Sequence, residues 1–167
     1  MMSSAIGRCA ALLCLGAMLA VALPAAASTT KTTTFQVSLV ISNDCAISAT
    51  ALSFGTSGML SANIDQTTTL SVTCSNTTPY NVGLDAGNVS GSTVATRLLG
   101  NGAATVQFQL YSDSSRTTVW GNTIGTNTVS GTGTGSAQSL TVYGQVPAQA
   151  TPAANTYTST VTASVTF

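Results

Sequence analysis

The most informative pattern of apolar and polar positions lies near the start of the chain, in residues 33–41. From Phe35 onward, every second position is apolar: Phe35, Val37, Leu39 and Ile41. Because successive side chains of a strand point to opposite faces, this alternation predicts an extended strand with one apolar face. Such a face is buried only where a sheet receives the strand. In a secreted protein the receiving sheet can belong to another molecule.

Six later runs also have the composition and alternation of strands, and clusters of Gly, Pro, Asn, Ser and Thr separate them. They are residues 45–53, 67–74, 80–84, 105–111, 140–146 and 156–167. No apolar repeat of 3.6 residues, the pattern typical of an amphipathic helix, follows residue 27. The pattern predicts an all-β fold, an antiparallel sandwich of immunoglobulin type. The Gly-, Thr-, Asn- and Ser-rich residues 121–136 are expected to form a mobile surface loop.

The last of these runs reaches the final residue, Phe167. One of its faces carries Tyr157, Ser159, Val161, Ala163, Val165 and Phe167. If this strand pairs inside a sheet, a strand that lies beyond it has to come from elsewhere. The expectation is an apolar groove beside an unpaired strand edge, which soluble monomers avoid.

Residues 1–27 have the three-part pattern of a signal peptide. Arg8 gives a weak positive charge, an apolar stretch follows over residues 10–23, and Ala25 and Ala27 suit a cleavage site after Ala27. The apolar stretch is too short for a membrane span. We therefore expect an exported chain with one mature domain.

Export determines which cysteines remain in the mature chain and whether they are expected to be oxidised. Cys9 and Cys14 lie in the signal segment, which leaves Cys45 and Cys74 as a pair in the mature chain. In an oxidising compartment such a pair is expected to form a disulfide. A metal site would lack ligands, because the chain has no His and the mature part has no other Cys.

Charged residues are scarce, and this excludes several classes of function. The mature chain carries three basic residues and four aspartates, with no Glu. Nucleic acids and anionic membrane surfaces attract clustered Lys and Arg, which are absent here. Catalysis is not expected either, since no His or Glu can serve as a general acid or base, and no cofactor motif occurs.

Two local features have both a structural and a functional reading. Trp120 is the single Trp of the chain, and we favour a place in the core or a loop over stacking on a sugar. Asp113 and Arg116 lie in a polar turn, where stabilising the turn is the simpler role.

A set of short motifs, in a fixed order, covers nearly all of the mature chain. It consists of Asn43-Asp44-Cys45, Leu52-Ser53-Phe54-Gly55, Leu70-Ser71-Val72-Thr73-Cys74, residues 80–87, Arg97-Leu98-Leu99, Leu110-Tyr111-Ser112-Asp113, Val119-Trp120-Gly121, residues 142–147 and the terminal run from Tyr157 to Phe167. In this order the motifs resemble the spore coat protein U domain family, the subunit type of archaic chaperone–usher pili. Asn155, Ser159 and the shifted Gln149 depart from the family pattern and concern a loop detail.

The resemblance implies an incomplete immunoglobulin-like sandwich that lacks its last strand and is completed by a donor strand from another subunit. Residues 28–42 would hold the donor strand, with Phe35, Val37, Leu39 and Ile41 as the inserted side chains, and residues 43–167 would form the pilin domain. Tyr157, Val161, Val165 and Phe167 would line the acceptor groove. The implied partners are other copies of the chain or related pilins, a periplasmic chaperone and an outer-membrane usher, with no nucleic acid, metal or cofactor. The implied location is a surface pilus that supports adhesion and biofilm formation.

Two other functions stay open from the sequence. The chain could be a secreted coat protein, as the family name suggests, or a single-domain carbohydrate-binding sandwich. The three hypotheses differ in what residues 28–41 do. A binding module without them should remain a soluble monomer, whereas a polymer subunit without them should be unable to extend a chain.

Overall fold

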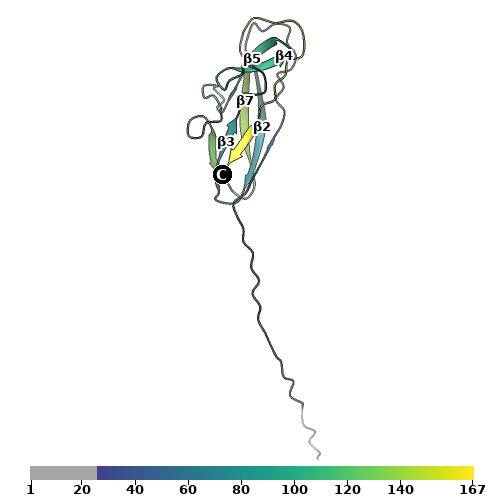
Figure 1. Ribbon diagram of the computed structural model, residues 1–167, viewed down its shortest axis with the longest axis vertical. Helices are drawn as coiled ribbons and strands as arrows, with labels where there is room; N and C mark the ends of the chain where they lie inside the picture. Colours follow the sequence, from purple (N-terminus) through teal and green to yellow (C-terminus); the bar gives the residue numbers. More distant parts are fainter. Residues whose placement is uncertain (1–25) are drawn as a thin grey trace, which may run out of the picture. The chain divides into compact units, whose positions relative to one another are not determined.

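The computed structural model describes residues 26–167, and in that range the chain forms strands and no helix. The strands are β1 (Cys45–Ala49), β2 (Ile64–Cys74), β3 (Pro79–Leu84), β4 (Arg97–Asn101), β5 (Ala104–Tyr111), β6 (Val129–Thr132), β7 (Ala137–Val146) and β8 (Ala163–Thr166) (Figure 1). The all-β prediction is therefore confirmed. In the described range, no helix long and apolar enough to cross a membrane is found. The predicted signal peptide lies almost wholly outside the described residues.

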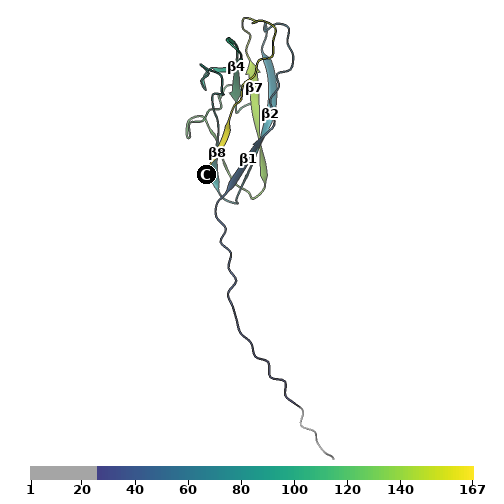
Figure 2. The ribbon, with the colours of Figure 1, turned by 45° about the vertical axis from the view of Figure 1, so that its right-hand side comes forward.

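The strands form two antiparallel sheets (Figure 2). One is five-stranded in the order β1-β2-β7-β5-β4, and the other is three-stranded in the order β6-β3-β8. The longest ladder joins β2 to β7, where Leu70 lies opposite Leu140. This is the layered arrangement of a β-sandwich.

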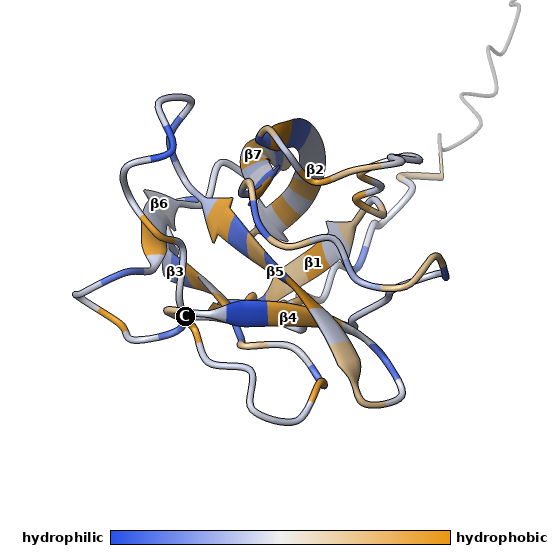
Figure 3. Cartoon of the chain, turned by 90° about the horizontal axis from the view of Figure 1, so that it is seen from above, coloured by the Kyte–Doolittle hydropathy of each residue, from blue (hydrophilic) through white to orange (hydrophobic). Residues whose placement is uncertain are grey.

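The core lies between the sheets and follows the alternation of the sequence. Hydrophobic and hydrophilic residues alternate along β5 and β7 (Figure 3). The buried apolar side chains come from four strands and one loop: Leu70, Val72 and Cys74 of β2, Tyr80, Val82 and Leu84 of β3, Val106, Phe108 and Leu110 of β5, Val142 and Val146 of β7, and Trp120. The burial of Trp120 confirms its expected place in the core.

Arg97 joins the two sheets from inside the core. Its side chain is fully buried and donates to the carbonyl oxygens of Leu84 at 2.9 Å, Asp85 at 2.8 Å and Trp120 at 2.7 Å. It also donates to Oε1 of Gln109 at 2.5 Å. Burial lowers the pKa of Arg97 to about 10, and the nearby Asp85 carboxylate opposes this change. The guanidinium thus stays charged at neutral pH, with acceptors that compensate for its burial.

The polar turn after β5 has the stabilising role that was expected. The carboxylate of Asp113 accepts from the backbone N–H of Thr118 at 2.7 Å and of Thr117 at 3.1 Å. These N–H groups hold the pKa of Asp113 below its ordinary value. Arg116 has a φ of 54°, and its Nε lies 3.3 Å from Oδ1 of Asp65.

Four expectations about secondary structure need correction. Residues 121–136 are not one surface loop, because β6 lies within them and pairs with β3. Strand β4 was not expected, although Arg97-Leu98-Leu99 stood out as a motif. The terminal run is a strand only over Ala163–Thr166, and the first run ends at Ala49.

Candidate functional site

A long groove opens along one side of the sandwich. Its volume is about 950 Å³. One rim is the segment 49–58 that continues from β1, and the other is the segment 151–163 that leads into β8. The floor consists of side chains that also form the core, among them Leu70, Leu84, Val106, Phe108, Leu110, Val142 and Val146. The groove therefore gives access to the hydrophobic core from outside.

The first rim rests on β7. Leu52 and Phe54 are half-buried and pack against the core, and the Phe54 ring meets the Phe108 ring edge-on with 6.2 Å between centroids. Both lie over Gly144, where an added Cβ would come within 2.5 Å of Leu52 Cδ2 and 3.0 Å of Phe54 Cζ. Glycine at this position lets the rim approach the sheet closely.

The second rim is an extended segment in which the backbone of every second residue forms a hydrogen bond to the body of the fold. Thr158 exchanges backbone hydrogen bonds with Gly100, at 3.1 Å from its N–H and 2.9 Å to its oxygen. Further along, the N–H of Thr160 donates to Oδ1 of Asn88 at 2.8 Å, and the oxygen of Thr162 accepts from the N–H of Asp85 at 3.0 Å.

Backbone polar groups of an extended chain alternate between its two sides. Since Thr158, Thr160 and Thr162 are bonded on one side, the N–H and C=O groups of the residues between them face the groove. Burial follows the same alternation: Tyr157, Ser159, Val161 and Ala163 are half-buried, and the threonines between them are exposed. This rim thus presents a strand edge and a row of inward-pointing side chains.

Asp85 holds the second rim in place. Its Oδ1 accepts from the N–H of Thr162 at 2.8 Å and of Gly87 at 2.9 Å. Partial burial raises the pKa of this carboxyl, but the hydrogen bonds from Thr162 and Gly87 and the charge of Arg97 together bring it below its ordinary value of 3.8. The carboxylate is therefore ionised at neutral pH and serves as a structural acceptor.

The residues expected to line a groove separate into two groups. Tyr157 and Val161 line the groove. Val165 lies opposite Val82 in the β3–β8 ladder and packs against the core, while Phe167 is 55% exposed. The first rim and the floor of the groove were not among the residues expected from the sequence. The motif Leu52-Ser53-Phe54-Gly55 was the available signal for the rim.

Residues 26–39 belong to one unit of the chain, and residues 40–167 form the other, the body. No strand is assigned to residues 26–44. Phe35, Val37, Leu39 and Ile41 are between 81% and 85% exposed. The alternating segment therefore has an exposed apolar face.

The expected disulfide is present. Cys45 and Cys74 are bonded, and they are direct partners in the β1–β2 ladder. The bond joins the first residue of β1 to the last residue of β2.

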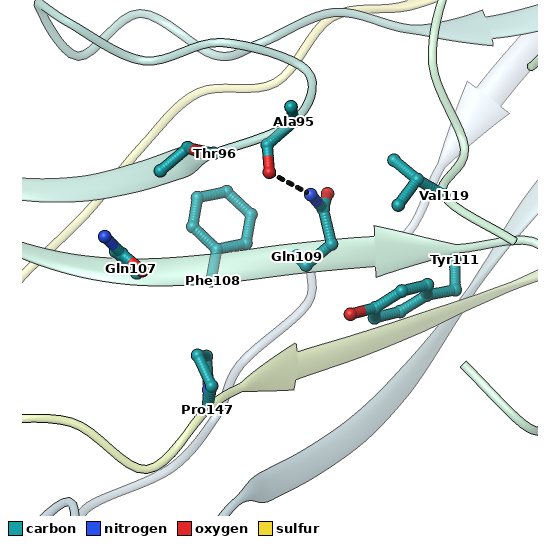
Figure 4. A pocket seen from close by; sticks show the side chains of 8 residues that line it. All are labelled: Ala95, Thr96, Gln107, Phe108, Gln109, Tyr111, Val119 and Pro147. Carbon is teal, nitrogen blue, oxygen red and sulfur yellow. Dashed lines mark hydrogen bonds between the residues drawn. The ribbon is translucent and has the colours of Figure 1, made fainter. Parts of the chain in front are cut away.

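A second, smaller cavity of about 240 Å³ lies beside β5 (Figure 4). Gln109, one of the two glutamines that line it, donates to the carbonyls of Val94 and Ala95 at 3.0 Å and accepts from Arg97. The amide group of Gln109 is thus used within the fold. No cluster of His, Cys, Asp and Glu suited to a metal ion occurs among residues 26–167.

Comparisons with known proteins point to one family. A family model described as Spore Coat Protein U domain matches residues 31–164. One similar solved structure is the CsuC–CsuE chaperone–tip adhesion subunit pre-assembly complex from the archaic chaperone-usher Csu pili of Acinetobacter baumannii. The identity to it is 25%, the TM-score is 0.55, and the match covers 75% of this chain and 40% of that chain. No curated protein matches this chain.

Proposed function

Because the chain belongs to the spore coat protein U domain family, we propose that it is a structural subunit of a surface pilus assembled by donor-strand exchange. In this proposal the groove of one copy accepts residues 33–41 of another copy. The role proposed for this chain is structural and requires no catalysis by the chain itself.

The observation that carries the proposal is the match between an unfilled groove and an unburied segment. The groove has an apolar floor and a rim with a strand edge, and the segment has an apolar side chain at every second position. An added strand gains backbone hydrogen bonds from the edge and specificity from alternate side chains that enter the groove. Burying four such side chains contributes roughly 1.5–3 kcal/mol each, as an upper bound.

Chain length disfavours insertion of the segment into the groove of its own copy. The segment ends at Ile41, and three residues separate it from Cys45. Folded back as a hairpin along β1, Ile41 would lie beside Cys45, while the groove begins only at Ala49. Val37 and Phe35 would then reach the start of the groove, and Leu39 and Ile41 would stay outside it. A second copy can supply all four side chains.

The same groove defines the other partners. A subunit with an open core is prone to aggregation, so it needs a temporary strand during export. We propose that a periplasmic chaperone lends this strand and that an outer-membrane usher catalyses its replacement by the next subunit. The fibre then lies on the cell surface, where it supports adhesion and biofilm formation.

The test compares cells that make the full chain with cells that make the chain without residues 28–41. Electron microscopy for surface fibres and gel analysis for SDS-resistant ladders after mild heating are the measurements. We expect fibres and ladders from the full chain and neither from the shortened chain. A shortened chain that forms the same fibres would overturn the proposal. A full chain that is secreted as a soluble monomer would favour the coat-protein or carbohydrate-binding alternative.

A further inference from the structure

The β1–β2 pairing continues past the start of β1, toward the N-terminal segment. The backbone N–H of Ser75 donates to the oxygen of Asp44 at 2.9 Å. In return, the N–H of Asp44 donates to Oγ of Ser75 at 3.0 Å. Ser75 directly follows β2, so its side chain takes the place that a backbone carbonyl would have in a longer ladder.

The Ser75 hydroxyl also reaches one step further along the chain. Its Oγ lies 3.4 Å from the oxygen of Ser42 and 3.3 Å from the oxygen of Asp44, so the hydroxyl can donate to either. Next to this contact, the side chain of Asp44 accepts from the N–H of Cys45 at 2.9 Å, and Cys45 is bonded to Cys74. Residues 42–45 are therefore attached to the end of β2 by a hydroxyl, a backbone hydrogen bond and a disulfide. We call this set the Ser75 anchor.

The position of the Ser75 anchor matters because of what lies before it. Ile41, the last side chain proposed to enter the neighbouring groove, directly precedes Ser42. A flexible connection between domains needs several unattached residues, usually Gly and Ser. Here the residues held by the Ser75 anchor begin at Ser42, immediately after Ile41. Ser42 to Asp44 can span only about 10 Å even when fully extended.

We propose that the Ser75 anchor makes the connection between successive copies a stiff joint, and that Ser75 is the residue that limits the bending of residues 42–44. This inference rests on the proposed function, since it concerns the link between a body and the strand that it donates. It adds that the fibre is a semi-rigid rod and that one serine hydroxyl governs its bending.

The experiment measures the persistence length of fibres, by electron microscopy, from cells that make full-length variants. Ser75→Ala removes the hydroxyl and retains the disulfide and the backbone hydrogen bond. We expect normal numbers of fibres and a persistence length reduced by roughly twofold or more, because the hydroxyl no longer holds residues 42–44. Ser75→Thr keeps the hydroxyl and should preserve the stiffness, and Ser139→Ala, at an exposed position on β7, is the matched control.

A second variant leaves the body unchanged and so does not depend on the folding of Ser75→Ala. Two glycines inserted between Ile41 and Ser42 should also make the fibres more flexible. If Ser75→Ala and the insertion both give fibres as straight as those of the unmodified chain, the joint is not governed by the Ser75 anchor, although donor-strand exchange stands. If the unmodified chain forms no fibres at all, the proposed function is wrong, and the inference of a stiff joint is wrong as well.

Discussion

The guanidinium of Arg97 donates to the carbonyl oxygen of Trp120 at 2.7 Å, and the indole N–H of Trp120 donates in turn to the oxygen of Val82 at 2.8 Å. Through these bonds, β4 of the larger sheet and β3 of the smaller one share a buried polar connection. Its disruption should cost much more than the loss of a surface charge.

We predict that Arg97→Lys lowers the free energy of unfolding by roughly 2–4 kcal/mol, because an ammonium group cannot satisfy all the acceptors that the guanidinium reaches. Urea unfolding followed by Trp120 fluorescence measures this change. Arg116→Lys is the control, since Arg116 forms a partly exposed ion pair with Asp65 and should change stability by less than about 1 kcal/mol. Equal losses in the two variants would contradict the structural role of Arg97.

The disulfide should contribute to stability through the unfolded state. It closes a loop between residues 29 positions apart. In the chain-entropy model, replacing both cysteines by Ala lowers the free energy of unfolding by roughly 3–4 kcal/mol. The same urea experiment tests this, with and without a reductant. The unmodified chain should lose stability on reduction, and the double variant should not respond.

The donor segment should tolerate charge on one face only. We predict that Val37→Asp or Leu39→Asp prevents polymerisation, because a carboxylate would have to be buried among apolar side chains. Chaperone binding should remain, since in the proposed function the chaperone occupies the groove and does not contact residues 33–41. Ser38→Asp places the same charge on the opposite face and should still polymerise. Normal SDS-resistant ladders from Leu39→Asp would disprove this assignment of the two faces.

Gly144 should matter for the groove more than for folding. A methyl group there would push the ends of the Leu52 and Phe54 side chains away from β7 and into the groove. Because these ends are flexible, we predict a small loss of stability and at least roughly tenfold weaker binding of a synthetic peptide of residues 33–42, equivalent to about 1.4 kcal/mol. Fluorescence anisotropy of the labelled peptide measures the binding. Ser139→Ala on the same strand is the control, because Ser139 is exposed and does not line the groove.

Asp85 should make stability depend on pH. Its pKa in the folded chain lies below its ordinary value of 3.8, so the carboxylate contributes stability above pH 3.8 and loses this contribution as the pH falls through the folded-state pKa. We therefore expect Asp85→Asn to be less stable than the unmodified chain at neutral pH and the difference to shrink below pH 3.8. Urea unfolding at a series of pH values tests this. A difference that does not depend on pH would show that the charge of Asp85 has no part in holding Thr162.

Strands whose side chains alternate between core and solvent could be predicted from the sequence, and β2 is the clearest case. There Leu70, Val72 and Cys74 are buried and the residues between them are more exposed. The family resemblance, inferred from motifs of low individual specificity in the right order, is likewise confirmed. Strand β6 was missed because Val129-Ser130-Gly131-Thr132 has little apolar content, and its pairing with β3 makes it a strand.

The groove was predicted only in part, for a physical reason. Alternation in the terminal run placed Tyr157 and Val161 on the inner face, and both line the groove. Alternation alone does not tell where a strand changes its partner. The terminal segment bonds to Gly100 of β4 at Thr158 and pairs with β3 only from Ala163 onward, and this depends on tertiary contacts. The rim at Leu52 and Phe54 depends in the same way on the absence of a side chain at Gly144.

The groove and the segment proposed to fill it also share an absence of charge. Among the described residues that line the groove, Tyr157 is the sole titratable one, and residues 32–41 contain none. A contact between this groove and this segment would respond little to salt or to moderate changes in acidity. The proposed fibres would then keep their length when a cell moves between dilute and saline, or neutral and mildly acidic, surroundings. Control of that length would rest with the supply of new subunits and not with the chemistry of the medium.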